Sequence, residues 1–220
     1  MGKLTTQLGF PEMETEHAAI IGLVGRRGSG KDTFAKVAEA AVMGSLDPFS
    51  VVTLALGGFV KLEVAKLVGH STAWVEEHKE QLRPLLQAWG TEFRRNLCDE
   101  DYWLTQLDES IGFNAPKDSI LIITDVRFEN EFDYIRARGG VIVRVENPRL
   151  VHDDPVDYHP SETWCDTCRP DAVFVNDAPM AYAESMRKGV EKLLLWAVEA
   201  KDHATATATA ETPESVESVS

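Results

Sequence analysis

The sequence predicts an α/β fold in which a five-stranded parallel sheet carries helices on both faces. Three observations support this class. Short apolar runs alternate with segments of helical periodicity along most of the chain. Ile120 to Thr124 forms an uninterrupted apolar run, as expected of a strand that is buried on both faces. A glycine-rich loop follows the first apolar run and opens directly into a helical segment.

Length and composition indicate one domain that stays inside the cell. A chain of 220 residues with 44% apolar residues can form one α/β domain with a full core, or at most that domain with a small lid. The net charge of −14 argues against nonspecific binding to nucleic acid or to an anionic membrane, because its field repels phosphate polymers. No stretch approaches a membrane span and the N-terminus lacks the pattern of an export signal, so we expect a cytoplasmic protein.

Two flanking segments lack the patterns of the central domain. Residues 1–17 are polar and show no period, so we expect a flexible N-terminal arm. Residues 203–220 form a low-complexity tail that we expect to be disordered. The predicted domain is therefore 18–202.

The predicted elements alternate in a regular order. We expect strands at Ala18–Val24, Ser50–Leu56, Ile120–Thr124, Val141–Val145 and Ala172–Val175. Helices are predicted after the glycine-rich loop, at Phe59–Val68, Pro84–Leu97, Asp99–Ile111 and Phe128–Arg138, and from Pro179 onward. Ser71 or Thr72 would cap a further short helix, and Pro84 would lie in the first turn of its helix. A helical insertion at about 57–112 thus separates the second and third strands.

The glycine-rich loop from Gly25 to Thr33 has the composition of a phosphate-binding P-loop. Gly25, Gly28 and Gly30 can adopt positive φ and let backbone N–H groups converge on phosphate oxygens. The start of the following helix adds partial positive charge, and Lys31 can reach the terminal phosphates. We therefore expect a nucleoside triphosphate at this loop. A turn that binds no ligand is the alternative.

The residue after the lysine departs from the usual P-loop pattern. A Ser or Thr hydroxyl normally binds Mg²⁺ at this position, but Asp32 stands here and the hydroxyl comes one place later, at Thr33. An aspartate can serve the metal directly or through water, because Mg²⁺ prefers oxygen ligands and keeps several waters. Asp32 and Thr33 are therefore the predicted metal ligands.

An aspartate and an arginine follow the third predicted strand. Ligands of parallel sheets bind beyond the carboxyl ends of the strands. Asp125 could therefore act on Mg²⁺, on its bound water, or as the acceptor for the attacking oxygen's proton. Arg127 could neutralise a phosphate. The alternative for Asp125 is structural, because it could cap the helix that begins at Phe128.

The insertion carries polar side chains at helical spacing. Arg83, Gln87, Thr91 and either Arg94 or Arg95 recur every three to four residues, so one side of a helix could present guanidinium, amide and hydroxyl groups together. Gly90 in the middle of a helix costs about 1 kcal/mol relative to Ala, which suggests that another group packs closely there. A solvated amphipathic helix with its tryptophans in the core is the alternative.

The segment 147–171 is long for a loop inside a compact domain. Loops of this length are often lids, and Arg149, His152, His159 and Arg169 beside phosphate chemistry favour that interpretation. The alternative to a lid is a flexible, solvated loop.

The cysteines indicate no disulfide framework. Cys98, Cys165 and Cys168 are too few, and the last two lack a second ligand pair at zinc-finger spacing. We interpret them as reduced thiols, with zinc near His152 and His159 as an outside alternative.

Several of these motifs together resemble the deoxynucleoside monophosphate kinases encoded by tailed bacteriophages, within the wider P-loop nucleoside monophosphate kinase group. The resemblance runs from about Ile20 to Leu195 and includes the unusual Asp32. Its carriers are Gly28-Ser-Gly-Lys-Asp-Thr33, Val60-Lys61, Arg83 with Leu86-Gln87 and Gly90-Thr91, Trp103, Asp125-Val-Arg127-Phe with Asn130-Glu131, and His159-Pro-Ser161-Glu162.

The resemblance implies a P-loop kinase fold and a set of site residues. ATP would be held by Arg27, Gly28, Ser29, Gly30, Lys31, Asp32 and Thr33. The acceptor monophosphate would lie near Val60, Lys61, Arg83, Gln87, Gly90, Thr91, Trp103, Asp125, Arg127 and Glu131. Catalytic roles would fall to Lys31, Arg83, Asp125 and Arg127.

The implied reaction moves the γ-phosphate of ATP, with Mg²⁺, to a deoxynucleoside 5′-monophosphate, for DNA precursor supply. A homodimer is compatible with the resemblance, and a phage-encoded chain would work in the cytoplasm of its host. Two other functions stay open. One is a P-loop kinase of another small phosphorylated acceptor, such as phosphomevalonate or dephospho-coenzyme A. The other is a P-loop ATPase or switch module that works through a partner.

Overall fold

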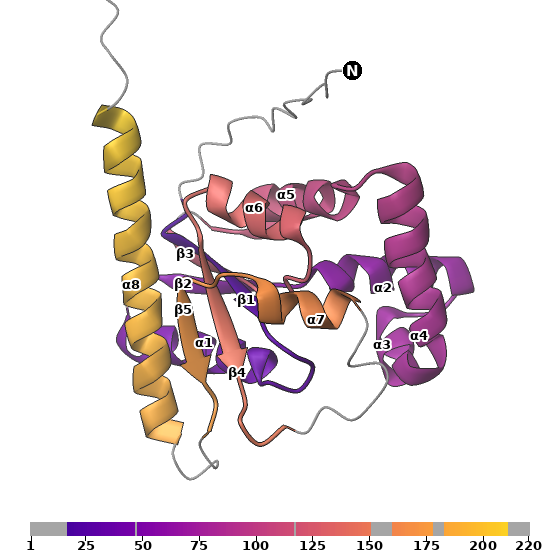
Figure 1. Cartoon of the computed structure of the whole chain (residues 1–220), viewed down its shortest axis with the longest axis horizontal. Helices are drawn as coiled ribbons and strands as arrows, with labels where there is room; N and C mark the ends of the chain where they lie inside the picture. Colours follow the sequence, from indigo (N-terminus) through magenta and orange to yellow (C-terminus); the bar gives the residue numbers. More distant parts are fainter. Residues whose placement is uncertain (1–16, 47, 117, 151–159, 178–182, 211–220) are drawn as a thin grey trace, which may run out of the picture.

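A single parallel sheet forms the centre of the protein. The computed structural model describes residues 17–46, 48–116, 118–150, 160–177 and 183–210. Five parallel strands lie in the order β2-β3-β1-β4-β5 (Figure 1). They are β1 Ala19–Val24, β2 Ser50–Leu54, β3 Ser119–Ile123, β4 Val141–Glu146 and β5 Ala172–Val175. The predicted five-stranded parallel sheet is confirmed, and each strand starts within one residue of its predicted position.

The central strands explain why two distant loops meet. β1 lies between β3 and β4, and Ile21 of β1 is paired with Ile122 on one side and Val141 on the other. All residues of β1 and β3 are buried, as expected of strands covered on both faces. Because β1 and β3 are parallel neighbours, the loops that follow them emerge at the same edge of the sheet.

Helices cover both faces of the sheet, as the sequence predicts. They are α1 Lys31–Ser45, α2 Leu56–Val68, α3 Thr72–Glu77, α4 Lys79–Gln87, the π-helix η1 Ala88–Cys98, α5 Tyr102–Asn114, α6 Glu129–Ala137, α7 Pro160–Thr167 and α8 Ala183–Ala210. Helices α1 and α8 share one apolar core with β1, β3, β4 and β5. The opposite face of the sheet packs against α5, α6 and α7 and the start of α2.

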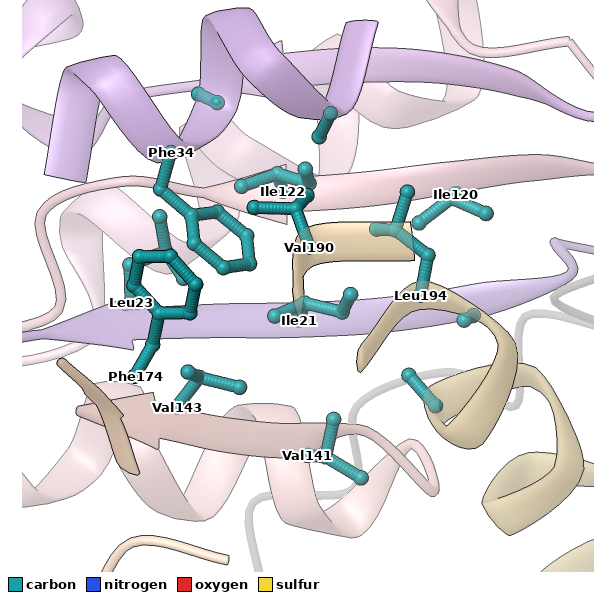
Figure 2. Packing of buried hydrophobic residues seen from close by; sticks show 14 of the residues in the cluster. Ile21, Leu23, Phe34, Ile120, Ile122, Val141, Val143, Phe174, Val190 and Leu194 are labelled. Carbon is teal, nitrogen blue, oxygen red and sulfur yellow. The ribbon is translucent and has the colours of Figure 1, made fainter. Parts of the chain in front are cut away.

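The core beneath α1 and α8 is closely packed. Phe34 of α1 meets Phe174 of β5 edge to face, with ring centroids 5.2 Å apart, a preferred aromatic geometry. Val190 and Leu194 of α8 are fully buried and point at the strands from the same side (Figure 2). This core anchors the start of α1, where the P-loop ends.

In the sequence, the helical insertion separates β2 from β3. Figure 1 shows its helices α2, α3 and α4 together on the side of the molecule away from α8. Ser71 caps α3 by accepting the backbone N–H of Trp74, which confirms one of the two predicted caps. Several predicted boundaries in the insertion were wrong. The helix predicted at Asp99–Ile111 is α5, which runs from Tyr102 to Asn114. Helix α2 begins at Leu56 rather than Phe59, and Pro84 lies inside α4 rather than in a first turn. Tertiary packing overrides the local proline signal in α4.

Two predictions for the C-terminal half need correction. The segment 147–171 was predicted to be irregular, but residues 160–167 form helix α7. Residues 151–159 lie outside the described part of the chain. Helix α8 continues to Ala210, so the part of the predicted disordered tail between 203 and 210 is helical. Alternating alanines keep helix propensity high enough there for α8 to continue. Of the predicted arm, only His17 is described, and its ring lies 3.3 Å from the Pro116 carbonyl.

Candidate active site

The P-loop joins β1 to α1 in the predicted conformation. Gly25, Gly28 and Gly30 have φ of 142°, 78° and 104°, a region that favours glycine. At Gly25 a side chain is also excluded by space, because a Cβ would lie 2.4 Å from the Val145 carbonyl oxygen. The backbone of the loop is therefore free to present its N–H groups at the start of α1, where the helix adds partial positive charge.

Lys31 folds back over this loop. Its Nζ donates to the carbonyl oxygens of Gly25 at 2.6 Å and Arg26 at 3.0 Å. These bonds hold the ammonium group beside the loop backbone and the edge of the sheet. Asn176, after β5, donates from Nδ2 to the Ser29 carbonyl at 3.0 Å and thereby supports the loop from behind.

One cavity of about 410 Å³ connects the P-loop with the helical insertion. It is lined by Arg27, Gly28, Lys31, Asp32, Ala55, Leu56, Gly57, Val60, Lys61, Glu76, Lys79, Arg83, Leu86, Gln87, Gly90, Thr91, Arg95, Trp103, Thr124, Asp125, Arg127, Phe128 and Glu131. Three predicted site residues do not line it: Ser29 is buried behind the loop, Gly30 is turned toward Asn176, and Thr33 is exposed on α1. All other predicted site residues do.

Asp125 joins the end of β3 to the start of α2. Its two carboxylate oxygens accept the backbone N–H groups of Leu56 and Gly57, both at 2.7 Å. It is therefore a helix cap, but of α2 rather than of the helix after Phe128 that the sequence suggested. Asp125 also lines the cavity, as the P-loop residues Gly28 and Lys31 do.

The basic residues of the insertion are paired with glutamates at the cavity rim. Lys61 lies 2.5 Å and Lys79 lies 3.2 Å from the Glu76 carboxylate, and Arg83 lies 2.6 Å from that of Glu80. The hydrogen bond from Lys61 holds the pKa of Glu76 below its usual value. Both glutamates are more than half exposed, and exposed ion pairs contribute little free energy. Lys61, Lys79 and Arg83 can therefore leave these glutamates and bind an anionic ligand with only a small loss of free energy.

The π-helix η1 decides which arginine reaches the cavity. In a π-helix the hydrogen bonds run from residue i to i+5 and each turn is wider than in an α-helix, so the residue five places on lies nearer the face of residue i than it would in an α-helix. Gly90 and Arg95 are five apart, are both buried and both line the cavity. Arg94 turns the other way, where its Nε donates to Glu63 at 2.8 Å. The sequence left the choice between Arg94 and Arg95 open because α-helical spacing does not distinguish them.

Gly90 is where the insertion comes closest to α2. A Cβ on Gly90 would meet the Val60 side chain at 3.3 Å, which confirms the predicted close packing. The Gly90 carbonyl accepts the indole N–H of Trp103 at 2.9 Å. Trp103 is only 2% exposed, so it forms part of the cavity wall and of the core at once.

Glu131, in the first turn of α6, is a buried residue that lines the cavity. Its Oε1 accepts from Nη2 of Arg95 at 2.6 Å, and its Oε2 accepts the backbone N–H groups of Arg127 at 2.6 Å and Phe128 at 3.2 Å. Burial raises the pKa of Glu131 to about 7, against the positive charge of Arg95, which lowers it. The predicted substrate residue Glu131 thus has both oxygens engaged by the protein.

The predicted lid is described only in part. His152 and His159 lie outside the described residues, and Arg149 and Arg169 do not line the cavity. Helix α7 contacts the P-loop through Asp166, which accepts from Nε of Arg26 at 3.1 Å.

The three cysteines are thiols, and the alternative of zinc near His152 and His159 lies outside the described part of the chain. Burial raises the pKa of Cys165 to about 11, so it is protonated at neutral pH. Cys98 and Cys168 are also free thiols. Within the described residues no three His, Cys, Asp or Glu side chains are grouped to hold a metal ion. Nor does any helix among them have the length and apolarity to cross a membrane.

Several cavity residues were not identified from the sequence. Lys79, Glu76, Thr124 and Phe128 line the cavity, but none belongs to a spacing pattern that separates it from an ordinary surface or core residue. Phe128 follows Arg127 directly and was noted only as part of a motif. Its position next to Arg127 was the sequence feature that could have identified it as a cavity residue.

Parts of this sequence are similar to known proteins. The sequence model for the family described as deoxynucleotide monophosphate kinase matches residues 58–186. The deoxynucleotide monophosphate kinase of Enterobacteria phage T4 is 32% identical over 120 residues, which cover 54% of this chain and 48% of that protein. The deoxynucleoside-5′-monophosphate kinase of Escherichia phage T5 is 35% identical over 89 residues, covering 37% of this chain and 33% of that protein.

Among solved structures, shikimate kinase from Bacteroides thetaiotaomicron aligns with 80% of this chain and 98% of its own, at 13% identity and a TM-score of 0.40.

Proposed function

The chain belongs to the deoxynucleotide monophosphate kinase family, and from that premise we propose that it transfers the γ-phosphate of ATP to a deoxynucleoside 5′-monophosphate. The products are ADP and the deoxynucleoside diphosphate, which would supply DNA synthesis. The observation that carries this proposal is the cavity that joins the P-loop to a second group of cations on the insertion. A kinase that phosphorylates a phosphate group must hold two anionic partners side by side.

The ATP side of the proposed reaction rests on the P-loop. Backbone N–H groups of the loop and the start of α1 would hold the β- and γ-phosphates. Lys31 would exchange its bonds to the Gly25 and Arg26 carbonyls for phosphate oxygens, since a charged acceptor is the stronger partner. Its charge would then offset the charge that develops on the transferred group.

The acceptor side rests on the insertion and on the loop after β3. Lys61, Lys79 and Arg83 would leave their exposed glutamate partners for the acceptor phosphate, and Arg127 would approach it from the sheet. An oxygen of the acceptor phosphate would attack the γ-phosphorus in line. The bond from the γ-phosphorus to the bridging oxygen would break, and ADP would leave with that electron pair, so no covalent enzyme intermediate is needed.

The residues at the start of α1 fit Mg²⁺. Asp32 lines the cavity beside Lys31, and one carboxylate is sufficient because Mg²⁺ takes its other ligands from phosphates and water. When bound, Mg²⁺ neutralises charge on the β- and γ-phosphates. Asp32 is the residue that would hold it, and Thr33, outside the cavity, would contribute less.

A panel of acceptors tests the proposed function. Formation of ADP from ATP would be measured with each common deoxynucleoside monophosphate, its ribonucleotide, phosphomevalonate and dephospho-coenzyme A. We expect a rate that rises strongly only with a nucleoside monophosphate. Turnover with phosphomevalonate or dephospho-coenzyme A alone would indicate another kinase, and ATP hydrolysis that no acceptor stimulates would indicate an ATPase or switch module.

A further inference from the structure

Both carboxylate oxygens of the buried Glu131 are bonded to the protein, although the residue lines the cavity. One oxygen is bonded to Arg95 and the other to two backbone N–H groups, and the residue is 2% exposed. Those two N–H groups belong to Arg127 and Phe128, which follow directly on the strand end that carries Asp125. Glu131 therefore fixes the backbone of the loop from which Arg127 enters the cavity.

Arg95 in turn fixes Glu131. Besides its 2.6 Å bond to Glu131, Arg95 donates from Nη1 to the Asn130 side chain at 3.1 Å and to the Glu100 carbonyl at 3.3 Å. Its guanidinium lies 4.1 Å from the centre of the Phe128 ring. Arg95 is thus held on four sides, and three of its contacts are to residues of the loop and helix that carry Arg127.

We propose that Arg95 is a positioning residue for the acceptor site: delivered by the π-helix η1, it acts through Glu131 to hold the backbone of Arg127 in the form that binds the acceptor phosphate. This inference rests on the proposed function. It links the insertion, which carries Lys61 and Arg83, to the loop after β3, which carries Arg127. The link adds to the one that Asp125 makes between the end of β3 and the start of α2.

A second buried ion pair, at the other end of α6 from Glu131, serves as a comparison for the pair of Arg95 and Glu131. At the far end of α6, Arg138 pairs with Asp108 of α5 at 3.0 Å, and Tyr134 donates to the same carboxylate. This pair is also largely buried and also joins α6 to another helix, but none of its residues lines the cavity. A role confined to stability would make the two pairs equivalent.

The test compares variants of the two pairs. Glu131→Gln keeps the side-chain size but offers one acceptor oxygen where three donors now converge. We expect the KM for the monophosphate to rise roughly five- to tenfold, the change in affinity that corresponds to the loss of about one hydrogen bond. The KM for ATP should change less than about twofold. Asp108→Asn, the matched control, should lower the Tm and leave both KM values unchanged.

A double variant separates positioning from stability. Arg95→Met alone leaves Glu131 buried without its cation, which destabilises strongly, whereas Arg95→Met with Glu131→Gln leaves no unpaired buried charge. We expect the double variant to recover much of the Tm but to retain the raised KM for the monophosphate. Recovery of that KM together with the Tm would overturn the proposal.

Amide exchange reports on the loop without relying on kinase activity. In the unliganded protein, the N–H groups of Arg127 and Phe128 should exchange faster in Glu131→Gln and in the double variant than in the wild type, and should be unchanged in Asp108→Asn. Equal exchange in all four proteins would refute the positioning role. If the wild type phosphorylates no nucleoside monophosphate, the proposed function fails, while the exchange result still decides whether Arg95 and Glu131 hold the loop.

Discussion

The Asp125 carboxylate at the end of β3 accepts the backbone N–H of Leu56, the first residue of α2, at 2.7 Å. A second bond of the same length reaches Gly57. The residue that the sequence predicted to act in catalysis therefore also sets where α2 begins. Helix α2 carries Val60 and Lys61 into the cavity, so this one side chain ties the sheet edge to the acceptor side of the site.

Replacing Asp125 should affect stability and acceptor binding together. Asp125→Asn loses one of two acceptor oxygens, and we expect a loss of about 1 kcal/mol of unfolding free energy, as for other helix caps. The KM for the monophosphate should rise because the start of α2 loosens. Ser71→Ala removes the cap of α3 and is the control: a similar loss of stability with an unchanged KM is expected. An Asp125→Asn protein with normal kinetics would limit this residue to capping.

Lys31 should be essential for turnover but not for folding. Lys31→Ala removes a positive charge from the proposed phosphate site, and we expect kcat to fall by about 10²–10³. Thermal unfolding should be little changed because the side chain is only half-buried. Lys36→Ala, an exposed lysine on the same helix α1, should retain full activity. Near-normal turnover by a folded Lys31→Ala protein would contradict the P-loop mechanism.

Asp32 should govern the requirement for Mg²⁺. Asp32→Ala should raise the Mg²⁺ concentration that gives half-maximal activity, and Asp32→Ser should raise it less, because a hydroxyl is the usual ligand at this position. Thr33→Val should have the smallest effect, since Thr33 does not line the cavity. Titration of activity with Mg²⁺ in the three variants measures this order. Equal values for Asp32→Ser and Asp32→Ala would make Asp32 structural.

Glu131 should make stability depend on pH. Burial raises its pKa to about 7 from an ordinary value of 4.5, so between these values the folded protein holds a proton that the unfolded chain has released. The free energy of unfolding should therefore fall as pH rises from about 4.5 to about 7 and level off above. Denaturant unfolding of the wild type and Glu131→Gln at several pH values isolates this contribution. In Arg95→Met the fall should continue to higher pH, because the charge that lowers the pKa is gone.

Trp103 should contribute to a preference for deoxyribose. Excluding an added hydroxyl by shape is a weak discriminator, worth roughly a hundredfold in kcat/KM. Trp103→Ala would cost about 3–5 kcal/mol of stability, so Trp103→Phe is the usable variant. We expect it to narrow the ratio of kcat/KM between a deoxynucleotide and the ribonucleotide of the same base. Trp164→Phe, outside the cavity, is the control. A ratio of one in the wild type would remove the preference for deoxyribose from the proposed function.

The sequence by itself determined the sheet and the P-loop. Strand positions follow from short apolar runs, and the loop from glycines, a lysine and flanking elements that are all within ten or so residues of one another. Such signals are local, so they survive whatever the rest of the chain does. The parallel order of β1 and β3 then brings the P-loop and Asp125 to one edge of the sheet, as predicted.

Only the tertiary structure decided which side chains contact one another around the cavity at the carboxyl ends of the strands. The sequence pattern could not show that Asp125 caps α2, because Leu56 and Asp125 are far apart in the chain. Nor could it choose between Arg94 and Arg95, since that choice follows from hydrogen bonds of a π-helix rather than from side-chain spacing. Glu131 is held by Arg95 because burial allows a carboxylate only where donors surround it, and those donors come from segments that meet only in the folded protein.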